Sequence, residues 1–90
     1  MNKTELTERI ARDCNVSLAA ASRMLESALA NITHQLKRGG AVQLTGFGTF
    51  RTARRAARIG RNPRTGEALK IRAAKVPKFA PGKALKDALN

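Results

Sequence analysis

A long, strongly basic segment with a turn at its centre places the tightest limits on the fold of this chain. Residues 51–78 read RTARRAARIGRNPRTGEALKIRAAKVPK, with no aromatic residue and a single acid, Glu67. Pro63 suits the second position of a type I turn because its φ is fixed, and Asn62 before it can accept hydrogen bonds from the turn backbone. Gly66 can adopt the left-handed conformation that closes such a loop without strain. The segment therefore predicts a long β-hairpin with little apolar surface to hold it against a core.

The hairpin forms an arm over about residues 53–75, and its predicted register sets the character of its two faces. If Ile59 faces Leu69, and Ala57 likewise faces Ile71, one face is mildly apolar. Arg58 then lies opposite Lys70, and these like charges repel unless an anion lies between them. A slip of one residue would exchange the two faces. Each limb of about ten residues reaches on the order of 30 Å at ~3.3 Å per residue, so the arm is suited to lie along a polyanion.

The excess of positive over negative charge is confined to the second part of the chain. The 90 residues suit a single domain, and the formal net charge is +12. Residues 1–36 carry four basic and four acidic groups, whereas residues 37–90 carry fourteen basic groups and two acids. A generic solubilising surface would intersperse both signs. This distribution indicates a neutral scaffold that carries a cationic binding surface.

Catalytic and metal-binding patterns are missing from the sequence. Cys14 is the only cysteine and His34 the only histidine, so neither an intrachain disulfide nor a thiolate metal cluster can form. Cys14 falls on the apolar stripe of the first expected helix, which predicts a buried small side chain, and His34 is expected to be a polar surface or interface residue. With no nucleophile–base pair or carboxylate cluster, we expect no enzyme activity, no cofactor and no metal.

The amino-terminal part predicts two helices. Asn2 and Glu5 have the form of a capping box for a first helix that ends near residue 14, and Ser17 is a good N-cap for the second helix. The second helix runs to about residue 38, where Gly39 and Gly40 end it. Its exposed face carries few cations, so we interpret the pair as scaffold and not as a helix–turn–helix reader of DNA. Its apolar stripe comprises Ala21, Leu25, Ala28, Ile32 and Leu36.

Three strands and a short helix complete the predicted architecture. Residues 41–45 and 49–52 are expected as strands joined by a tight reversal at residues 46–48, and residues 73–79 return from the arm as the third strand. Pro77 suggests that this last strand lies at an edge or carries a bulge. The expected fold is α+β, with a helical hairpin base (1–40), a three-stranded antiparallel sheet with a long β-ribbon arm (41–79) and a short C-terminal helix (80–90).

The predicted sheet needs a second copy of the chain to cover it. Three short strands expose two faces, and the helical hairpin covers only one of them. The three aromatic residues of the chain, all phenylalanines, gather at the base of the arm and need burial. An isologous homodimer would bury them, with both arms on the same side. The expected dimer core is Phe47, Phe50, Phe79, Leu44, Leu36 and Ile32.

Three motifs, in order and at their separations, carry a resemblance that covers all 90 residues. They are Gly46-Phe47-Gly48-x-Phe50, then Gly60-Arg61-Asn62-Pro63-x-Thr65-Gly66, then Val76-Pro77-x-Phe79-x-Pro81-Gly82-Lys83. The chain resembles the HU family of bacterial histone-like DNA-binding proteins, sisters of integration host factor. The ending at Asn90 is more similar to HU than to the longer integration host factor chains, which favours weak sequence preference.

The resemblance implies an intertwined dimer whose two arms embrace DNA through the minor groove and bend it. Pro63 corresponds to the tip proline that wedges between base pairs in this family, whose members are known for this mechanism. Arg64 stands where relatives commonly have Gln or Lys, and Arg72 where many have Pro, so both add charge to the arm. The expected DNA-binding residues are Lys3, Arg51, Arg54, Arg55, Arg58, Arg61, Asn62, Pro63, Arg64, Lys70, Arg72, Lys75, Lys78, Lys83 and Lys86.

The expected partner is double-stranded DNA, with a preference for bent, nicked or gapped duplexes, in the cytoplasm and nucleoid of a bacterium. An RNA-binding basic protein and a sequence-preferring bender similar to integration host factor remain alternatives, as does a heterodimer with a paralogue. The arm lacks aromatic residues, which argues against base-stacking recognition of single strands. A membrane partner is not expected, because no apolar run reaches ~18 residues and the N-terminus lacks the apolar core of a signal peptide.

Overall fold

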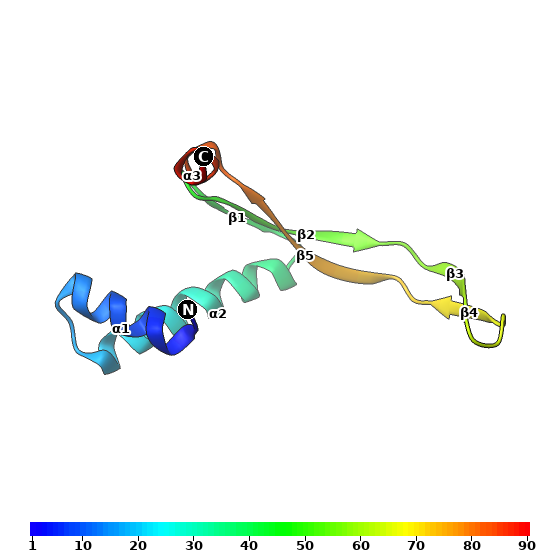
Figure 1. Ribbon diagram of the computed structural model, residues 1–90, viewed down its shortest axis with the longest axis horizontal. Coiled ribbons are helices and arrows are strands. Elements are labelled where there is room, and N and C mark those ends of the chain that lie inside the picture. The colour runs from blue at the N-terminus through cyan, green and yellow to red at the C-terminus, as the bar shows by residue number, and fades with distance from the viewer. The chain divides into compact units, whose positions relative to one another are not determined.

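The computed structural model describes the backbone of residues 1–90 and the side chains of all of them except Arg58 and Ile71. The chain divides into two compact units, Met1–His34 and Gln35–Asn90, and each is described by itself. Figure 1 shows the elements in chain order. They are α1 (Lys3–Cys14), α2 (Leu18–Lys37), β1 (Ala41–Leu44), β2 (Gly48–Arg55), β3 (Arg58–Arg61), β4 (Ala68–Ile71), β5 (Ala74–Pro81) and α3 (Lys83–Leu89).

Side-chain caps start both helices of the first unit, as the sequence predicts. The Asn2 Oδ1 accepts a hydrogen bond from the Glu5 N–H at 2.8 Å, and the Ser17 Oγ accepts one from the Ala20 N–H at 3.1 Å. Each oxygen satisfies an amide that has no partner within its helix. Asn15 ends α1 in the left-handed conformation, with φ 54°. Asparagine tolerates that conformation better than most residues, so the short break between α1 and α2 is locally determined.

Within residues 1–34, α1 and α2 pack through small side chains. Ala21 is fully buried and Thr7 is buried, with its Oγ1 donating to the Lys3 carbonyl at 2.8 Å. An ion pair between Lys3 and Glu26 joins the two helices. Because Lys3 and Glu26 are both more than half exposed, we assign this pair little stabilising free energy.

The prediction that Cys14 is buried is wrong, because its side chain is exposed. The predicted stripe steps four residues at a time, and each such step advances about 40° around an α-helix with 3.6 residues per turn. From Leu6 to Cys14 the stripe rotates by about 80°, so it does not mark one buried face, and Leu6 itself is 40% exposed. Cys14 lies seven residues after the buried Thr7 and so on nearly the same face, but it is the last residue of α1.

A glycine motif ends α2 at the start of the second unit. Gly39 has φ 78°, its N–H donates to the Leu36 carbonyl at 3.0 Å, and the Gly40 N–H donates to the Gln35 carbonyl at 3.1 Å. This pair of bonds is a Schellman motif, which satisfies carbonyls that lack partners at the end of a helix. The motif turns the chain directly into β1, as the two glycines predict.

The antiparallel sheet has the order β1-β2-β5, so β2 is central and β5 is an edge strand. β1 pairs with β2 from Ala41↔Arg51 to Leu44↔Gly48, and β2 pairs with β5 from Gly48↔Pro81 to Arg55↔Ala74. The edge position predicted from Pro77 is confirmed. β3 and β4 form a separate two-stranded ladder that continues the arm beyond the sheet (Figure 1).

The arm register differs by one residue from the predicted one. Ile59 pairs with Lys70 and Gly60 pairs with Leu69, so Arg58 lies opposite Ile71 and not opposite Lys70. The turn explains the shift, because the Asn62 N–H donates to the Glu67 carbonyl at 2.8 Å and closes a four-residue loop. The predicted register requires an odd number of loop residues, which this closure excludes.

The three phenylalanines cluster at the base of the arm, as predicted. The Phe79 ring lies 4.8 Å from the Phe50 ring and 5.6 Å from the Phe47 ring, centroid to centroid, and both pairs are tilted. Gly48 lies beneath this cluster, where an added Cβ would approach the Phe79 Cζ to 2.5 Å. Its lack of a side chain allows β2 and the Phe79 ring to approach this closely.

Candidate nucleic-acid interface

The arm is a β-ribbon built from two successive ladders that share one register. The first joins β2 to β5, and the second joins β3 to β4. Residues 56–57 and 72–73 separate the two ladders and belong to neither strand pair. From residue 52 to residue 61 the outgoing limb would span roughly 30 Å at ~3.3 Å per residue. A ribbon of this length carries its side chains well away from the sheet to which it is attached.

Hydrogen bonds pre-organise the tip of the arm. The Asn62 Oδ1 accepts from the Arg64 N–H at 2.9 Å, and the Asn62 carbonyl accepts from the Gly66 N–H at 2.8 Å. Gly66 has φ 73°, the left-handed conformation predicted for it. Pro63 is exposed at the start of this loop. The loop therefore presents a rigid, apolar ring to solvent on a backbone that already has its hydrogen bonds.

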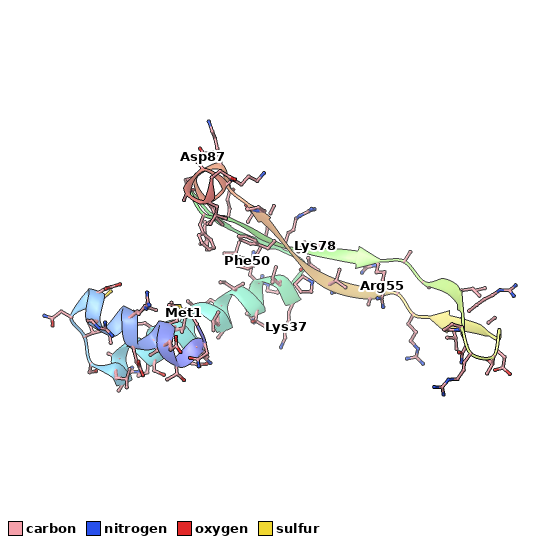
Figure 2. The ribbon with its side chains drawn as sticks, in the orientation of Figure 1. Met1, Lys37, Phe50, Arg55, Lys78 and Asp87 are labelled. Atoms are coloured by element: carbon pink, nitrogen blue, oxygen red, sulfur yellow. The ribbon has the colours of Figure 1, made fainter. Side chains whose placement is uncertain are left out.

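The β2–β5 register places basic residues on both faces of the arm root. Side chains alternate between the faces of a strand, so Arg54 shares a face with Thr52, and Arg51 lies on the opposite face with Arg55. Arg54 pairs directly with Lys75, and Arg51 pairs with Lys78. Figure 2 shows Arg55 and Lys78 on this part of the ribbon. The like-charge pair predicted from the sequence, Arg58 opposite Lys70, is excluded by the register. Like charges instead face each other at the Arg54–Lys75 and Arg51–Lys78 pairs.

In the described part of the arm, the basic side chains form no ion pair with a carboxylate of the chain. Among the side chains that the structure describes, the ion pair within 4.0 Å joins Lys3 to Glu26, and none involves the arm. Glu67 is the single acid of the arm, and its backbone forms hydrogen bonds within the tip. Its N–H donates to the Thr65 Oγ1 at 3.3 Å, and its carbonyl accepts from the Asn62 N–H. The described cations of the arm therefore remain available to an external anion.

The structure brings most of the predicted site residues together on the arm and separates a few. The exposed cations of the arm and its root are Arg51, Arg54, Arg55, Arg61, Arg64, Lys70, Arg72, Lys75 and Lys78. Asn62 and Pro63 form the tip, and the Arg58 side chain lies outside the described residues. Lys83 and Lys86 are exposed on α3, whereas Lys3 belongs to the first unit and is paired with Glu26.

Thr52 lies near the site and is not indicated by any motif in the sequence. The Thr52 hydroxyl donates to the Leu36 carbonyl at 2.7 Å, which ties β2 to the last turn of α2. The sequence offers only a weak signal for this contact, a threonine on the inner face of a strand that follows a helix and two glycines.

The described part of the chain contains neither a cluster of metal-ligating side chains nor a membrane-spanning helix. No three His, Cys, Asp or Glu side chains gather there in a way that could hold a metal ion. Among the described helices, none combines the length and apolar character needed to cross a bilayer.

The facing cations at the arm root predict that a charge reversal stabilises the free ribbon. Lys75→Glu places a carboxylate opposite Arg54, and we expect amide hydrogen exchange in β2 and β5 to slow by about two- to fivefold at low salt. The effect should shrink as salt screens the pair. Lys86→Glu on α3 makes the same change in net charge away from the ribbon and is the matched control. Equal slowing in both variants would contradict the pairing and indicate a general charge effect.

The comparisons with known proteins agree over the whole chain. The family described as bacterial DNA-binding protein matches residues 1–90. DNA-binding protein HU-beta of Salmonella typhimurium is 56% identical over 90 residues, with 100% of both chains covered. DNA-binding protein HU-alpha of Escherichia coli is 57% identical over 89 residues, with 99% of each covered.

A solved structure confirms the fold class. The HU–DNA cocrystal structure from Anabaena matches with a TM-score of 0.92 and 39% identity, covering 99% of this chain and 97% of that one. HU from Thermotoga maritima matches with a TM-score of 0.72 and 32% identity over the full length of both chains. The chain therefore belongs to the family of bacterial DNA-binding proteins, and its full-length similarity to HU-alpha and HU-beta makes it a protein of the HU type.

Proposed function

We propose that this protein is an architectural DNA-binding protein that bends double-stranded DNA with little sequence preference. The observation that carries the proposal is the arm, a ribbon roughly 30 Å long whose described cations have no carboxylate partner and whose tip exposes a proline. The Anabaena neighbour, with a TM-score of 0.92, is titled as an HU–DNA cocrystal structure, which supports the same class of ligand. The proposed sites of action are the bacterial cytoplasm and nucleoid.

The side chains of the arm favour contacts to phosphates over reading of base edges. Sequence-specific readout relies on amide and guanidinium groups held in fixed geometry against the bases. Asn62 supplies the one side-chain amide of the arm, and its Oδ1 is already engaged by the Arg64 N–H. The cations that remain suit phosphates and a narrow, strongly negative minor groove. Affinity should therefore come mainly from counterion release, with little dependence on sequence.

The proposed mechanism combines phosphate neutralisation along the arms with a wedge at Pro63. Proline has no N–H to desolvate when it meets stacked bases, and the hydrogen bonds of the tip hold its backbone in place. Unstacking one base step costs a few kcal/mol, which the additional contacts along a bent duplex offset. A nicked or gapped duplex has already lost part of that stacking, so it should bind more tightly than intact duplex.

The working unit in this proposal is a dimer. Leu44, Phe47 and Phe79 are 40%, 47% and 41% exposed in the single chain, and Phe50, Leu36 and Ile32 are half-buried. Exposed large apolar side chains, with Phe47 and Phe50 gathered around Phe79, indicate an interaction surface, and a second copy of this chain supplies a matching one. The proposed unit is a homodimer, and a heterodimer with a paralogue would use the same residues.

The dimer proposal predicts melting that depends on concentration. If the folded chain requires its partner, the thermal midpoint should rise as the protein concentration rises, because association stabilises only the folded state. Calorimetry over a hundredfold concentration range, with the mass in solution measured in parallel, tests this. A constant midpoint together with a monomer mass would rule the dimer out.

The phosphate-contact proposal predicts a steep salt dependence. Eight basic residues lie between Arg54 and Lys75, and a dimer carries twice that number. If about half of them contact phosphates, the logarithm of the binding constant should fall with the logarithm of salt concentration with a slope of roughly −5 to −8. Titrations of two unrelated duplexes and one RNA hairpin measure this. A shallow slope, strong preference for one duplex, or tighter binding to the RNA would contradict the proposal.

The wedge predicts that Pro63→Ala reduces DNA bending more than it reduces affinity. The phosphate contacts persist in this variant, so intact duplex should lose only about two- to fivefold in affinity, while the preference for gapped duplex disappears. Energy transfer between labels at the duplex ends measures the bend. Arg64→Ala is the control, because it removes an adjacent charge and keeps the proline. An unchanged bend angle in Pro63→Ala would show that the proline only shapes the turn.

A further inference from the structure

Thr52 lies where the arm loses the support of its third strand. β1 begins at Ala41, which pairs with Arg51, so Thr52 is the first residue along β2 with no β1 partner. From Thr52 outward, β2 is paired only with β5. At this position the Thr52 hydroxyl donates to the Leu36 carbonyl at 2.7 Å, and both residues are half-buried. At the position where the pairing of β2 with β1 ends, β2 is therefore joined to the end of α2 by a hydrogen bond.

The end of α2 does not need this hydrogen bond for its own satisfaction. The Leu36 carbonyl already accepts from the Gly39 N–H at 3.0 Å within the Schellman motif. Removing the Thr52 hydroxyl would therefore leave no buried carbonyl without a partner. The contribution of the hydroxyl lies in the link itself, which joins the helix end to the outgoing strand.

Among the side-chain hydrogen bonds that the structure describes, the one from Thr52 links the root of the arm to the end of α2. It spans sixteen residues, and the next longest joins Gln35 to Ala41 at a marginal 3.5 Å. Across the ladder, Thr52 faces Pro77 on an edge strand, and proline contributes no N–H. The Thr52 hydroxyl therefore supplies the side-chain hydrogen bond of longest sequence separation in the described part of the chain, and it links the root of the arm to the helix end.

We infer that Thr52 is a positioning residue for DNA bending, which fixes the direction in which the arm leaves the sheet. The inference rests on the proposed function of the Pro63 tip. For an arm of roughly 30 Å, a change of about 10° in its angle at the root displaces the tip by about 5 Å. That displacement exceeds the ~3.4 Å spacing of bases along a strand. If the root were mobile, Pro63 would therefore insert at any of several neighbouring base steps instead of one.

Thr52→Val tests the inference because it removes the hydroxyl and keeps the β-branched shape and the charge. Without DNA, we expect amide exchange at residues 53–55 to accelerate by about two- to tenfold, the range that an ordinary hydrogen bond contributes. With DNA, the bend angle should fall and its distribution should broaden, while the salt slope stays at the wild-type value because no cation is lost. Thr52→Ser, which restores the hydroxyl, should recover most of both effects.

Thr49→Val is the matched control. Thr49 is a half-buried threonine of the same strand, paired with Gln43 and Ala80, and its described hydroxyl makes no side-chain hydrogen bond. The inference would be overturned if Thr52→Val showed the amide exchange rates and the DNA bend angle of the wild type. It would also be overturned if Thr52→Ser did not restore the wild-type exchange rates and bend angle. If the wild-type protein does not bend DNA, the proposed function fails. The exchange data in the free protein then decide whether Thr52 anchors the arm.

Discussion

The ladder between β2 and β5 is the constraint on which the rest of the structure depends. It joins the three-stranded sheet to the arm, running from Gly48↔Pro81 to Arg55↔Ala74 in one continuous register. Cations face each other across it at two places, so side-chain electrostatics oppose the ribbon that the backbone hydrogen bonds hold together. At its inner end, the Phe79 ring packs over Gly48 and against the Phe50 ring, which stabilises the ladder there.

The repulsion between facing cations, which the backbone hydrogen bonds of the ladder overcome, explains why the arm is suited to bind a polyanion. A salt-bridged ribbon would have to give up its own carboxylate partners before contacting phosphates, whereas the described cations of this arm have none. Binding of phosphates along the ribbon would remove repulsion that the free protein carries. The acids of residues 1–36 instead balance the bases of that segment in number, and Lys3 pairs with Glu26, so the net positive charge belongs to residues 37–90.

The local features of the fold could be predicted from the sequence because short-range chemistry determines them. The caps at Asn2 and Ser17, the glycine stop after α2 and the left-handed Gly66 each depend on residues a few positions apart. The same holds for the edge strand inferred from Pro77 and for the basic composition of the arm. The turn residues and the charge distribution together were enough to predict a neutral scaffold that carries a cationic arm.

Only the tertiary structure decided which residues face one another. The arm register shifted by one because the hydrogen bond of Asn62 to Glu67 closes an even-numbered loop, and periodicity does not report loop closure. Cys14 is exposed although it lies seven residues after the buried Thr7, on nearly the same face of α1, and it is the last residue of that helix. A sequence pattern does not show how far along a helix the neighbouring element covers it. The bond from Thr52 to Leu36 joins residues sixteen apart, and such a contact exists only once helix end and strand have been brought together.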